Sequence, residues 1–347
     1  MIKRAPFVMG GVEVAPGTRQ TIHLPVSTLP DQTPVTLSAH VIHGRKDGPT
    51  QFVSAGIHGD EVIGVEIVRR LLRAKTLSRL RGTLIVVPIV NSFGFLNHSR
   101  YLPDRRDLNR CFPGSPNGSL ASRLAHIFLN EIAARCTLGI DLHSAAINRT
   151  NLPQVRVSAN DRETMRLAKV FGAPVILTSA LRDGSLRQEA KNIGVDVLLY
   201  EAGEGMRFDE MSVRAGVAGI LRVLKETAML PVAGIAKPKA NSLLCADSSW
   251  LRAPAGGLLR LFKAEGDLVE EGDLVAAISD PFGEDETDVT CHRSGIIVGR
   301  AVMPVVYEGD ALFHIAAVKS ADMAEATVDD LAGQLEEAAL FDEDEII

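Results

Sequence analysis

Cysteine and aromatic residues are scarce in this sequence. Four cysteines occur in 347 residues and none forms a CxxC pair, which argues against both a disulfide scaffold and a thiolate zinc finger. One tryptophan and an aromatic content of 5% are too little for a surface on which nucleobases stack. A chain of this length can bury a large core without disulfides or structural zinc sites, and it is long enough for about two domains of ordinary size.

Long apolar runs and basic clusters are missing as well. The longest apolar runs, such as residues 84–90, are far shorter than the roughly 18 residues of a membrane-spanning helix, so no membrane partner is expected. No basic stripe with interleaved aromatic residues occurs, so nucleic acid is not an expected partner either. Residues 1–17 lack the apolar core of a signal peptide, and we therefore expect the protein in the cytoplasm.

Positive charge is absent from the end of the chain. The net charge is −6, but no Lys or Arg follows Lys319, whereas ten acidic residues do. Removing those ten negative charges from the total leaves residues 1–319 with a net charge of +4. We expect residues 320–347 to form an acidic helical tail.

The periodicity of apolar residues divides the rest of the chain into three parts. Alternation in residues 1–45 predicts an N-terminal β segment that packs on the body. Strand patterns (51–57, 84–90, 138–142, 174–177, 195–200) then alternate with helix patterns (61–74, 119–136, 162–171, 186–192, 212–228). This alternation predicts an α/β domain over residues 46–230, with a mostly parallel or mixed sheet covered on both faces.

The composition changes after residue 230. Residues 230–241 are rich in Pro, Gly, Ala and Lys, as linkers are, and residues 240–319 contain short strand patterns separated by glycines. The Gly-Asp turns at 266–267 and 272–273 resemble those of the barrel-sandwich hybrid fold of biotinyl and lipoyl carrier domains. The corresponding hairpin tip at 280–285 has no Lys for attachment, so we expect a smaller, lipoyl-like all-β domain without the carrier chemistry.

Three residues at predicted strand ends suggest a metal site. His58 and Glu61 lie in the motif HGDE (58–61) directly after one strand, and His143 ends another. Because ligands gather at the carboxyl ends of strands in such sheets, the three side chains are expected to meet there. A His/Glu/His set leaves an open fourth position, as catalytic zinc requires. The alternative is a solvated turn and two histidines that bond loop carbonyls; we favour the metal for the joint pattern.

Two further features indicate chemistry at the same edge. Residues 100–110 contain four Arg and one Asn, which are donors suited to carboxylate recognition, although such a run is also compatible with a solvated loop. Glu201 closes an apolar strand and is placed to accept a proton from water. Glu204, in the glycine-flanked loop that follows, competes for this role.

Together, HGDE (58–61), DLNR (107–110), DLH (141–143) and Glu201 resemble the succinylglutamate desuccinylase/aspartoacylase family, a branch of the zinc-carboxypeptidase superfamily. The resemblance covers about residues 45–230 in motif order and spacing. It implies a zinc-carboxypeptidase-like three-layer α/β/α domain with a mixed sheet and one Zn²⁺ per chain. It also implies hydrolysis of the amide of an N-acyl amino acid or a similar small amide.

The resemblance also implies roles for individual residues. Arg100 would polarise the scissile carbonyl, although Arg105 and Arg106 compete because the interval between Arg100 and DLNR is longer than in aspartoacylases. Arg187 and Arg182 are candidates for binding the acyl group. The remaining roles are zinc ligation by His58, Glu61 and His143, acid–base catalysis by Glu201, binding of the substrate carboxylate by Asn109 and Arg110, and orientation of a ligand histidine by Asp107.

Several alternatives remain open at this point. A metallocarboxypeptidase that cleaves peptide C-termini uses the same metal and carboxylate chemistry. A carrier protein, or a metal-dependent binding protein in which Glu201 is only structural, would not be an enzyme. The β domain is expected to shape the active-site entrance or to build an interface of a homo-oligomer. Substrates of the N-acetyldiaminobutyrate, N-acetylaspartate and N-succinylglutamate types all fit the sequence.

Overall fold

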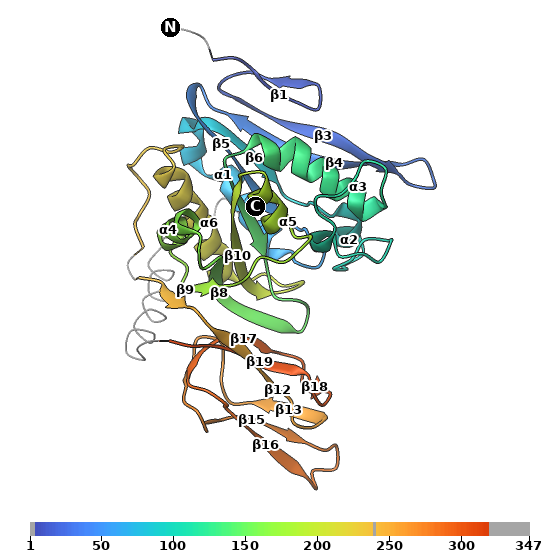
Figure 1. Ribbon diagram of the computed structural model, residues 1–347, viewed down its shortest axis with the longest axis vertical. Coiled ribbons are helices and arrows are strands. Elements are labelled where there is room, and N and C mark those ends of the chain that lie inside the picture. Colours follow the sequence, from blue (N-terminus) through green and yellow to red (C-terminus); the bar gives the residue numbers. More distant parts are fainter. Residues whose placement is uncertain (1–3, 239–240, 319–347) are drawn as a thin grey trace, which may run out of the picture.

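A large mixed β-sheet between two layers of helices forms the body of the protein (Figure 1). The structure is a computed structural model and describes residues 4–238 and 241–318. The fold is therefore the mixed α/β fold expected from the alternating pattern. Across the sheet the strands are β12 (Ser248–Arg252), β19 (Ala311–Ala316), β17 (Gly295–Ala301), β8 (Arg149–Val157), β10 (Asp196–Glu204), β7 (Leu138–His143), β5 (Lys46–Ala55), β6 (Arg81–Val87), β4 (Pro34–His43) and β3 (Thr18–Thr28).

The centre of this sheet is parallel. Strands β10, β7, β5 and β6 pair in parallel, while β8, β4 and β3 pair antiparallel to their neighbours toward the two edges. Residues 51–55 of β5 and all six residues of β7 are buried, which explains why these strands do not show the alternation of a half-exposed strand. Because the central strands are parallel, their carboxyl ends lie at one edge of the sheet.

Helices cover both faces. On one face, an apolar cluster joins the sheet to α1 (Ile63–Arg73), α4 (Arg162–Phe171) and α6 (Glu210–Glu226). On the other face, a second cluster includes α3 (Leu120–Ile127), α5 (Leu186–Asn192) and Phe93 of the short helix α2 (Ser92–Leu96). The helix expected over residues 119–136 is shorter: α3 ends at Ile127 and continues as a π turn and a 3₁₀ turn to residue 135. Its expected N-cap is present, because the Ser119 side chain accepts a hydrogen bond from Ser122 N.

The N-terminal residues extend the sheet at one edge. A hairpin of β1 (Phe7–Met9) and β2 (Val12–Val14) precedes β3, and β3 and β4 pair over 10 positions before β4 joins β6. Apolar residues of β1 to β4 belong to the same cluster as α3 and α5. The N-terminal β segment therefore packs on the body.

The C-terminal residues continue the sheet at the other edge. Strand β8, which the sequence analysis did not predict, pairs with β10 on one side and with β17 and β9 (Val175–Thr178) on the other. In the described part of residues 241–318 all regular elements are strands. The further strands here are β11 (Leu243–Cys245) and β14 (Leu268–Val269) in the main sheet, and β16 (Glu286–Thr290), β15 (Leu274–Ser279), β13 (Gly257–Leu261) and β18 (Val305–Val306) in a second sheet.

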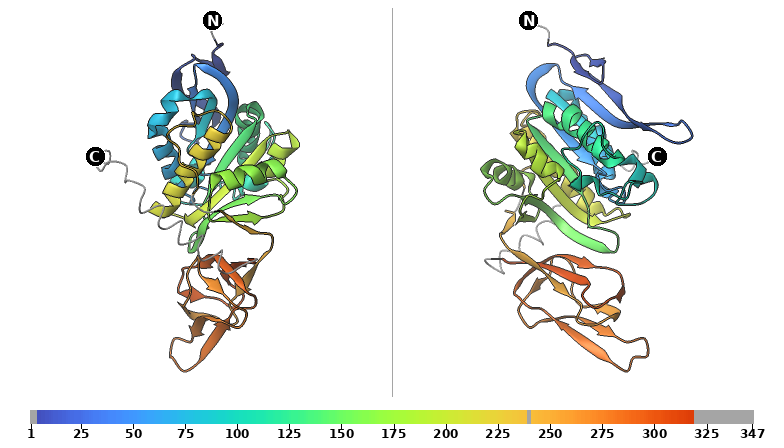
Figure 2. Two further views of the ribbon diagram at one scale, coloured as in Figure 1. Left: turned by 90° about the vertical axis from the view of Figure 1, so that its left-hand side faces the viewer. Right: turned by 45° about the vertical axis from the view of Figure 1, so that its right-hand side comes forward.

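A separate apolar cluster fills the space between these two sheets. In two further views the C-terminal strands lie at the opposite end of the molecule from β1 and β3 (Figure 2). Residues 241–318 are called the C-terminal segment below; the domain boundaries at 45, 230 and 240 and the barrel-sandwich arrangement stay predictions. The acidic tail predicted for residues 320–347 lies outside the described residues. No helix in the described ranges is both long and apolar enough to cross a membrane.

Candidate metal centre and active site

Polar side chains gather where the parallel strands end. His143, the last residue of β7, is the register partner of Glu201 on β10. Their side chains therefore emerge on the same face of the sheet, about 5 Å apart along the pairing direction. Tyr200 and Ala202 alternate with Glu201 and pack into the cluster of α1 and α6 on the opposite face. The alternation of a strand thus sends apolar residues to one helical layer and the candidate functional residues to the other face.

The turn between β5 and α1 carries His58 and Glu61 and is packed tightly against α2. A Cβ atom at Gly59 would lie 1.9 Å from the carbonyl carbon of Gly94, so only glycine fits between His58 and Asp60. This close approach buries the turn: His58 and Glu61 are each only 3% exposed. The HGDE motif is therefore a packing requirement as well as a source of ligands.

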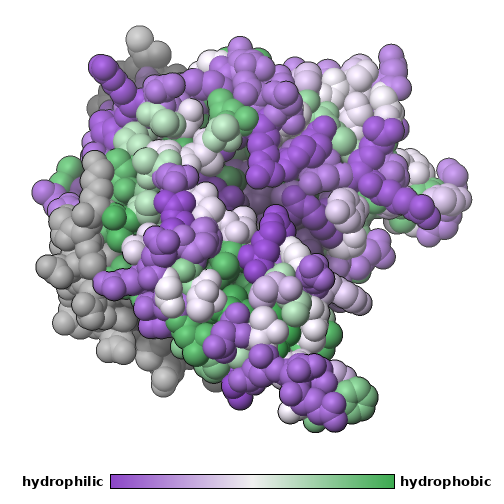
Figure 3. Space-filling view, turned by 60° about the horizontal axis from the view of Figure 1, so that its bottom comes forward, coloured by the Kyte–Doolittle hydropathy of each residue, from purple (hydrophilic) through white to green (hydrophobic). Residues whose placement is uncertain are grey.

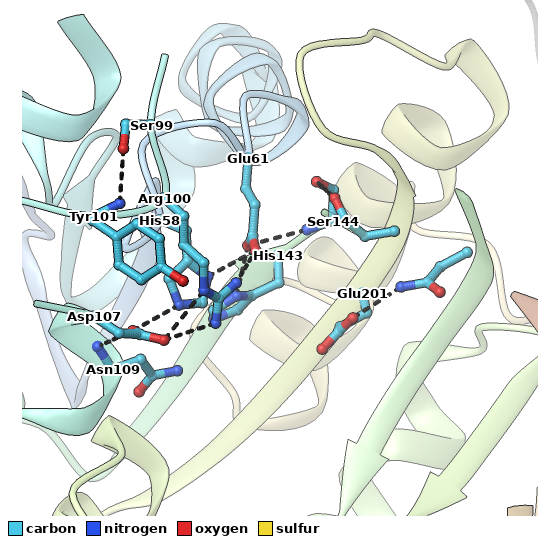
Figure 4. Close-up of polar contacts among 12 residues, drawn as sticks. His58, Glu61, Ser99, Arg100, Tyr101, Asp107, Asn109, His143, Ser144 and Glu201 are labelled. Atoms are coloured by element: carbon cyan, nitrogen blue, oxygen red, sulfur yellow. Dashed lines mark hydrogen bonds and ion pairs between the residues drawn. The ribbon is translucent and has the colours of Figure 1, made fainter. Parts of the chain in front are cut away.

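The three predicted ligands converge (Figure 4). The two carboxylate oxygens of Glu61 lie 2.7 Å from His58 Nδ1 and 2.7 Å from His143 Nδ1. One donor atom from each residue lies within 4.8 Å of the others, and all three residues are buried. Two imidazole nitrogens and one carboxylate oxygen at this spacing are a donor set that zinc accepts.

The second nitrogen of each histidine contacts a further carboxylate. His58 Nε2 lies 3.2 Å from Asp107 and His143 Nε2 lies 2.8 Å from Asp141, whose other oxygen accepts a hydrogen bond from Ser54 Oγ at 2.7 Å. Because a carboxylate accepts and does not donate, these contacts favour a proton on each Nε2, so that each Nδ1, which faces Glu61, is the nitrogen that would bind a metal. The DLNR motif predicts Asp107 for this role, whereas Asp141 and Ser54 were not among the predicted residues. The spacing i, i+2 in DLH, which places Asp141 and His143 on one face of a strand, is the signal that identifies Asp141.

The electrostatics of the cluster favour a cation. Burial alone would raise the pKa of Glu61, but His58 and His143 outweigh it and hold that pKa below its ordinary value. Burial alone would lower the pKa of both imidazoles, yet Glu61 and Asp107 raise the pKa of His58, and Asp141 and Glu61 raise the pKa of His143. Carboxylates thus surround the two histidines with negative charge.

Of the arginines in the 100–110 segment, Arg100 is the one that reaches this cluster. Its guanidinium lies 2.9 Å from Asp107 and 3.4 Å from Glu61, with 28% of the side chain exposed. The competitors Arg105 and Arg106 are exposed, and Arg106 has an ion-pair distance of 3.9 Å to Asp104. Arg100 therefore borders both the metal ligands and solvent.

Asn109 and Arg110 lie in a short 3₁₀ turn that begins after Asp107. The Asn109 side-chain oxygen accepts a hydrogen bond from Leu186 N at 2.9 Å, which ties this turn to the start of α5. The side-chain nitrogen of Asn109 is not used in this contact and can donate a hydrogen bond to a ligand. Arg110 is exposed, and its guanidinium contacts the carbonyl of Asn109.

Glu201 lies beside the cluster rather than in it (Figure 4). One of its oxygens accepts a hydrogen bond from Asn151 at 2.9 Å and the other lies 3.2 Å from a guanidinium nitrogen of Arg156. Both partners come from β8, which explains why the sequence analysis missed them. The competitor Glu204 accepts a hydrogen bond from Asn148 N at 3.1 Å in the loop before β8.

The C-terminal segment supports the position of Asn151. Gly299 of β17 is the register partner of Asn151, and a Cβ atom at Gly299 would lie 2.5 Å from the Asn151 side-chain oxygen. His314 of β19 is the next residue in this cross-strand row, and its ring stacks on Trp250 of β12 at 4.7 Å. Because Gly299 has no side chain, the Asn151 side chain has space to occupy the position from which it bonds Glu201.

Arg187 is a half-buried cation near Glu201. Its guanidinium donates to the carbonyls of Arg156 and Ala180 and to the Ser179 hydroxyl. Burial, with a smaller contribution from Arg156, lowers the pKa of Arg187 to about 10, so the group stays charged at neutral pH. Arg182, the other candidate for the acyl group, is exposed. One face of the molecule is hollowed, and hydrophilic side chains surround the hollow (Figure 3).

The fold and site define an α/β protein with a His/Glu/His cluster at the carboxyl edge of a mixed sheet. Residues 47–227 match the succinylglutamate desuccinylase/aspartoacylase catalytic domain. This match covers more than half of the chain, and the protein therefore belongs to that family.

Individual relatives cover most of the chain. N-alpha-acetyl-L-2,4-diaminobutyric acid deacetylase of Halomonas elongata is 27% identical over 292 residues, which are 79% of this chain and 84% of that protein. A solved succinylglutamate desuccinylase/aspartoacylase from Rhodobacter sphaeroides is 25% identical with a TM-score of 0.78, covering 86% of this chain and 96% of that one. The product-bound ectoine utilization protein EutE (DoeB) of Ruegeria pomeroyi is 24% identical with a TM-score of 0.77, covering 86% and 95%.

Proposed function

We propose that the protein is a zinc-dependent amidohydrolase that removes the acyl group from an N-acyl amino acid. The observation that carries this proposal is the buried convergence of His58, Glu61 and His143, with Glu201 on the neighbouring strand. Membership of a family named for a desuccinylase and an aspartoacylase supports the reaction class.

The residues fit a zinc ion by the chemistry of their donors. His58 Nδ1, a Glu61 carboxylate oxygen and His143 Nδ1 would hold it, while Asp107 and Asp141 orient the two imidazoles. When bound, zinc would lower the pKa of a coordinated water toward about 7 and polarise the amide carbonyl.

The chain's own groups perform the proton transfer. Glu201 accepts a proton from the attacking water and passes it to the leaving amine, which a carboxylate beside the metal ligands is placed to do. Asn151 and Arg156 hold the Glu201 carboxylate in place from β8. Arg100, at the solvent-facing side of the ligands, stabilises the negative charge that develops on the carbonyl oxygen.

Residues around the candidate metal site are assigned to substrate binding. We assign the Asn109 amide nitrogen and the exposed Arg110 guanidinium to the substrate carboxylate, because together they offer a planar fork and one further donor. We assign the acyl group to the side of Arg187. The Halomonas elongata relative makes N-acetyl-2,4-diaminobutyrate the first substrate to test.

The test is a substrate panel with measured zinc content. Zinc-loaded protein is incubated with N-acetyl-2,4-diaminobutyrate, N-acetylaspartate, N-succinylglutamate and a peptide with a free C-terminus, and the released amine is quantified. We expect turnover of at least one N-acyl amino acid, loss of turnover on chelation and recovery on adding zinc. Turnover of the peptide alone would replace the proposal by a carboxypeptidase, and turnover that survives removal of all metal would refute it.

A further inference from the structure

A hollow lies at the opposite edge of the sheet from the candidate active site. Its volume is about 1370 Å³, and it is lined by residues at the start of β3, the end of β4, the starts of β5 and β6, and the ends of α1 and α6. The candidate active site lies at the carboxyl ends of β5 and β7, so it and this hollow are at opposite ends of β5. We call this hollow the basic groove.

The basic groove concentrates positive charge that no carboxylate of the described residues pairs with. It is lined by eight Lys and Arg side chains and by no Asp or Glu: Arg19, Arg45, Lys46, Arg73, Lys75, Arg79, Arg81 and Lys225. Within residues 4–238 and 241–318, none of the eight forms an ion pair; Arg19, Arg81 and Lys225 contact only backbone carbonyls. Like charges at this density repel one another, so an anion that bridges them would be stabilised.

Helix termini account for three of these cations, including Arg19, which donates a hydrogen bond to the carbonyl of Leu72 in the last turn of α1. Arg73 and Lys225 lie in the last turns of α1 and α6, where a cation interacts favourably with the negative end of the helix dipole. The other cations, which come from residues 45–46, from β6 and from the 3₁₀ turn at Lys75–Arg79, are not at the end of an α-helix. Their common feature is that they face the same hollow.

The chain itself contains a complementary anion. Residues 320–347 hold ten carboxylates and no Lys or Arg, whereas residues 1–319 carry a net charge of +4. We propose that this acidic segment, residues 320–347, binds in the basic groove of the same molecule. Residues 264–292 also hold ten carboxylates and no Lys or Arg, but they belong to strands and turns of the C-terminal segment, at the opposite end of the molecule from β3 (Figure 2).

The length of the segment is sufficient for this contact. Val318, near the end of the described chain, packs against the same apolar cluster as Leu243, and Val232 lines the groove. The 11 residues from Val232 to Leu243 span at most about 40 Å. An extended chain of the 28 residues from 320 to 347 reaches about 90 to 100 Å, so the acidic segment can reach the groove from Val318 with length to spare.

The contact is expected to depend strongly on salt. Ion pairs on an open surface are individually weak and are screened within about 10 Å at 0.1 M ionic strength. Several of them acting together at low salt would hold the segment, and 1 M salt would release it. Because the groove is at the far edge of the sheet, binding there leaves the candidate active site open.

Zero-length carbodiimide cross-linking of the full chain tests the proposal, because this reagent joins an amine and a carboxylate only when they are in contact. At 50 mM salt we expect peptides of residues 320–347 linked to Lys46, Lys75 and Lys225, at least tenfold more often than to Lys169 and Lys263, which lie outside the groove. At 1 M salt these links should disappear. The readout is mass spectrometry and does not involve catalysis. The result therefore tests this proposal independently of the proposed function.

Matched variants complete the test. The groove variant Arg45→Gln/Arg79→Gln should lose most of the links, and the control variant Arg162→Gln/Arg207→Gln, which changes two exposed arginines elsewhere, should keep them. Links that are no more frequent than those to the control lysines would overturn the proposal. Links found only between isotopically light and heavy copies in a mixture would overturn it too, because the segment would then bind a second molecule.

Discussion

The two halves of the candidate site are built in different ways. The metal half consists of His58, Glu61 and His143, which lie in two short motifs, and both imidazoles are oriented by carboxylates. The proton-transfer half consists of Glu201, whose partners Asn151 and Arg156 come from β8, about 50 residues earlier in the chain. The first half is a local property of two strand ends, whereas the second depends on correct pairing of the sheet.

The difference extends to the C-terminal segment. A Cβ atom at Gly299 of β17 would lie too close to the Asn151 side chain, so the C-terminal segment contributes to the geometry beside the candidate base. Nothing in the described residues connects β17 to the metal half in this way. Substitutions in the C-terminal segment should therefore affect proton transfer and leave metal binding intact.

The largest effect is expected in the metal half. His143→Ala removes one of three protein ligands, and we expect the purified variant to contain little zinc and to lose at least about a thousandfold in kcat/KM, since zinc supplies the water activation. Elemental analysis and the deacylation assay measure the two quantities. His23→Ala, at an exposed histidine on β3, is the control and should retain both; a His143→Ala protein with a full complement of zinc would contradict the assignment.

Glu201→Gln separates the two halves. The amide cannot accept a proton, so kcat should fall by about 10² to 10⁴, the usual contribution of a general base, while zinc content stays at the wild-type level. Glu204→Gln is the matched control and should keep most of the activity, because Glu204 bonds a loop amide instead. The reverse outcome, with Glu204→Gln inactive and Glu201→Gln active, would move the base to Glu204.

A smaller effect should come from the residues that position Glu201. Asn151→Ala removes a 2.9 Å hydrogen bond to Glu201, and Gly299→Ala pushes a methyl group against Asn151. We expect each to lower kcat about tenfold, the equivalent of one hydrogen bond to a charged group, with unchanged KM and zinc content. If both act through Asn151, the double variant should be no worse than Asn151→Ala alone.

Gly256→Ala serves as the control for this pair. A Cβ atom there meets its nearest neighbour at 3.5 Å, an ordinary contact, so kcat should not change. Fully additive losses in the Asn151/Gly299 double variant, or equal losses in the Gly256 control, would show that the C-terminal segment does not act through Asn151.

For His314 we expect an effect on stability and the smallest effect on activity. Burial, with Arg156 nearby, lowers the pKa of His314 to about 4, whereas an unfolded histidine titrates near 6.5. Between these values the unfolded chain binds the extra proton, so the free energy of unfolding rises with pH by at most about 1.4 kcal/mol per unit from pH 4 to 6.5. Above pH 6.5 this contribution is complete.

Replacing the titrating ring tests this contribution. His314→Gln should flatten the pH dependence of the free energy of unfolding, measured by denaturant titration at pH 4.5 and 6.5. An unchanged difference between the two pH values would show that other groups cause the dependence. The stacked Trp250 gives a fluorescence signal close to the altered position.

The sequence predicts the metal half well because its information is local. Residues three apart in HGDE and the strand-end position of His143 place all three ligands at one edge once the strands are known to be parallel. The motif DLNR likewise identifies Asp107, which lies at 3.2 Å from His58. Most helices and strands of residues 46–230 were also predictable, since each has a clear apolar period.

The proton-transfer half could not be predicted in this way. Strand β8 contains Asn, Pro, Gln and Arg among its apolar residues, so its pattern does not stand out, and no spacing rule links Asn151 to Glu201 or Gly299. The use of the Asn109 side-chain oxygen by Leu186 N depends in the same way on a contact 77 residues apart. Pairing over such distances is decided by the complete sheet rather than by any one segment.

X-ray absorption spectroscopy of the zinc-loaded protein tests the central claim most directly, because it reports the atoms around the metal. The account predicts one zinc per chain with nitrogen and oxygen neighbours at about 2.0 to 2.2 Å, scattering from two imidazoles, and no sulfur at about 2.3 Å. A sulfur neighbour, or a spectrum without imidazole scattering, would place the metal away from His58, Glu61 and His143 and would contradict the account.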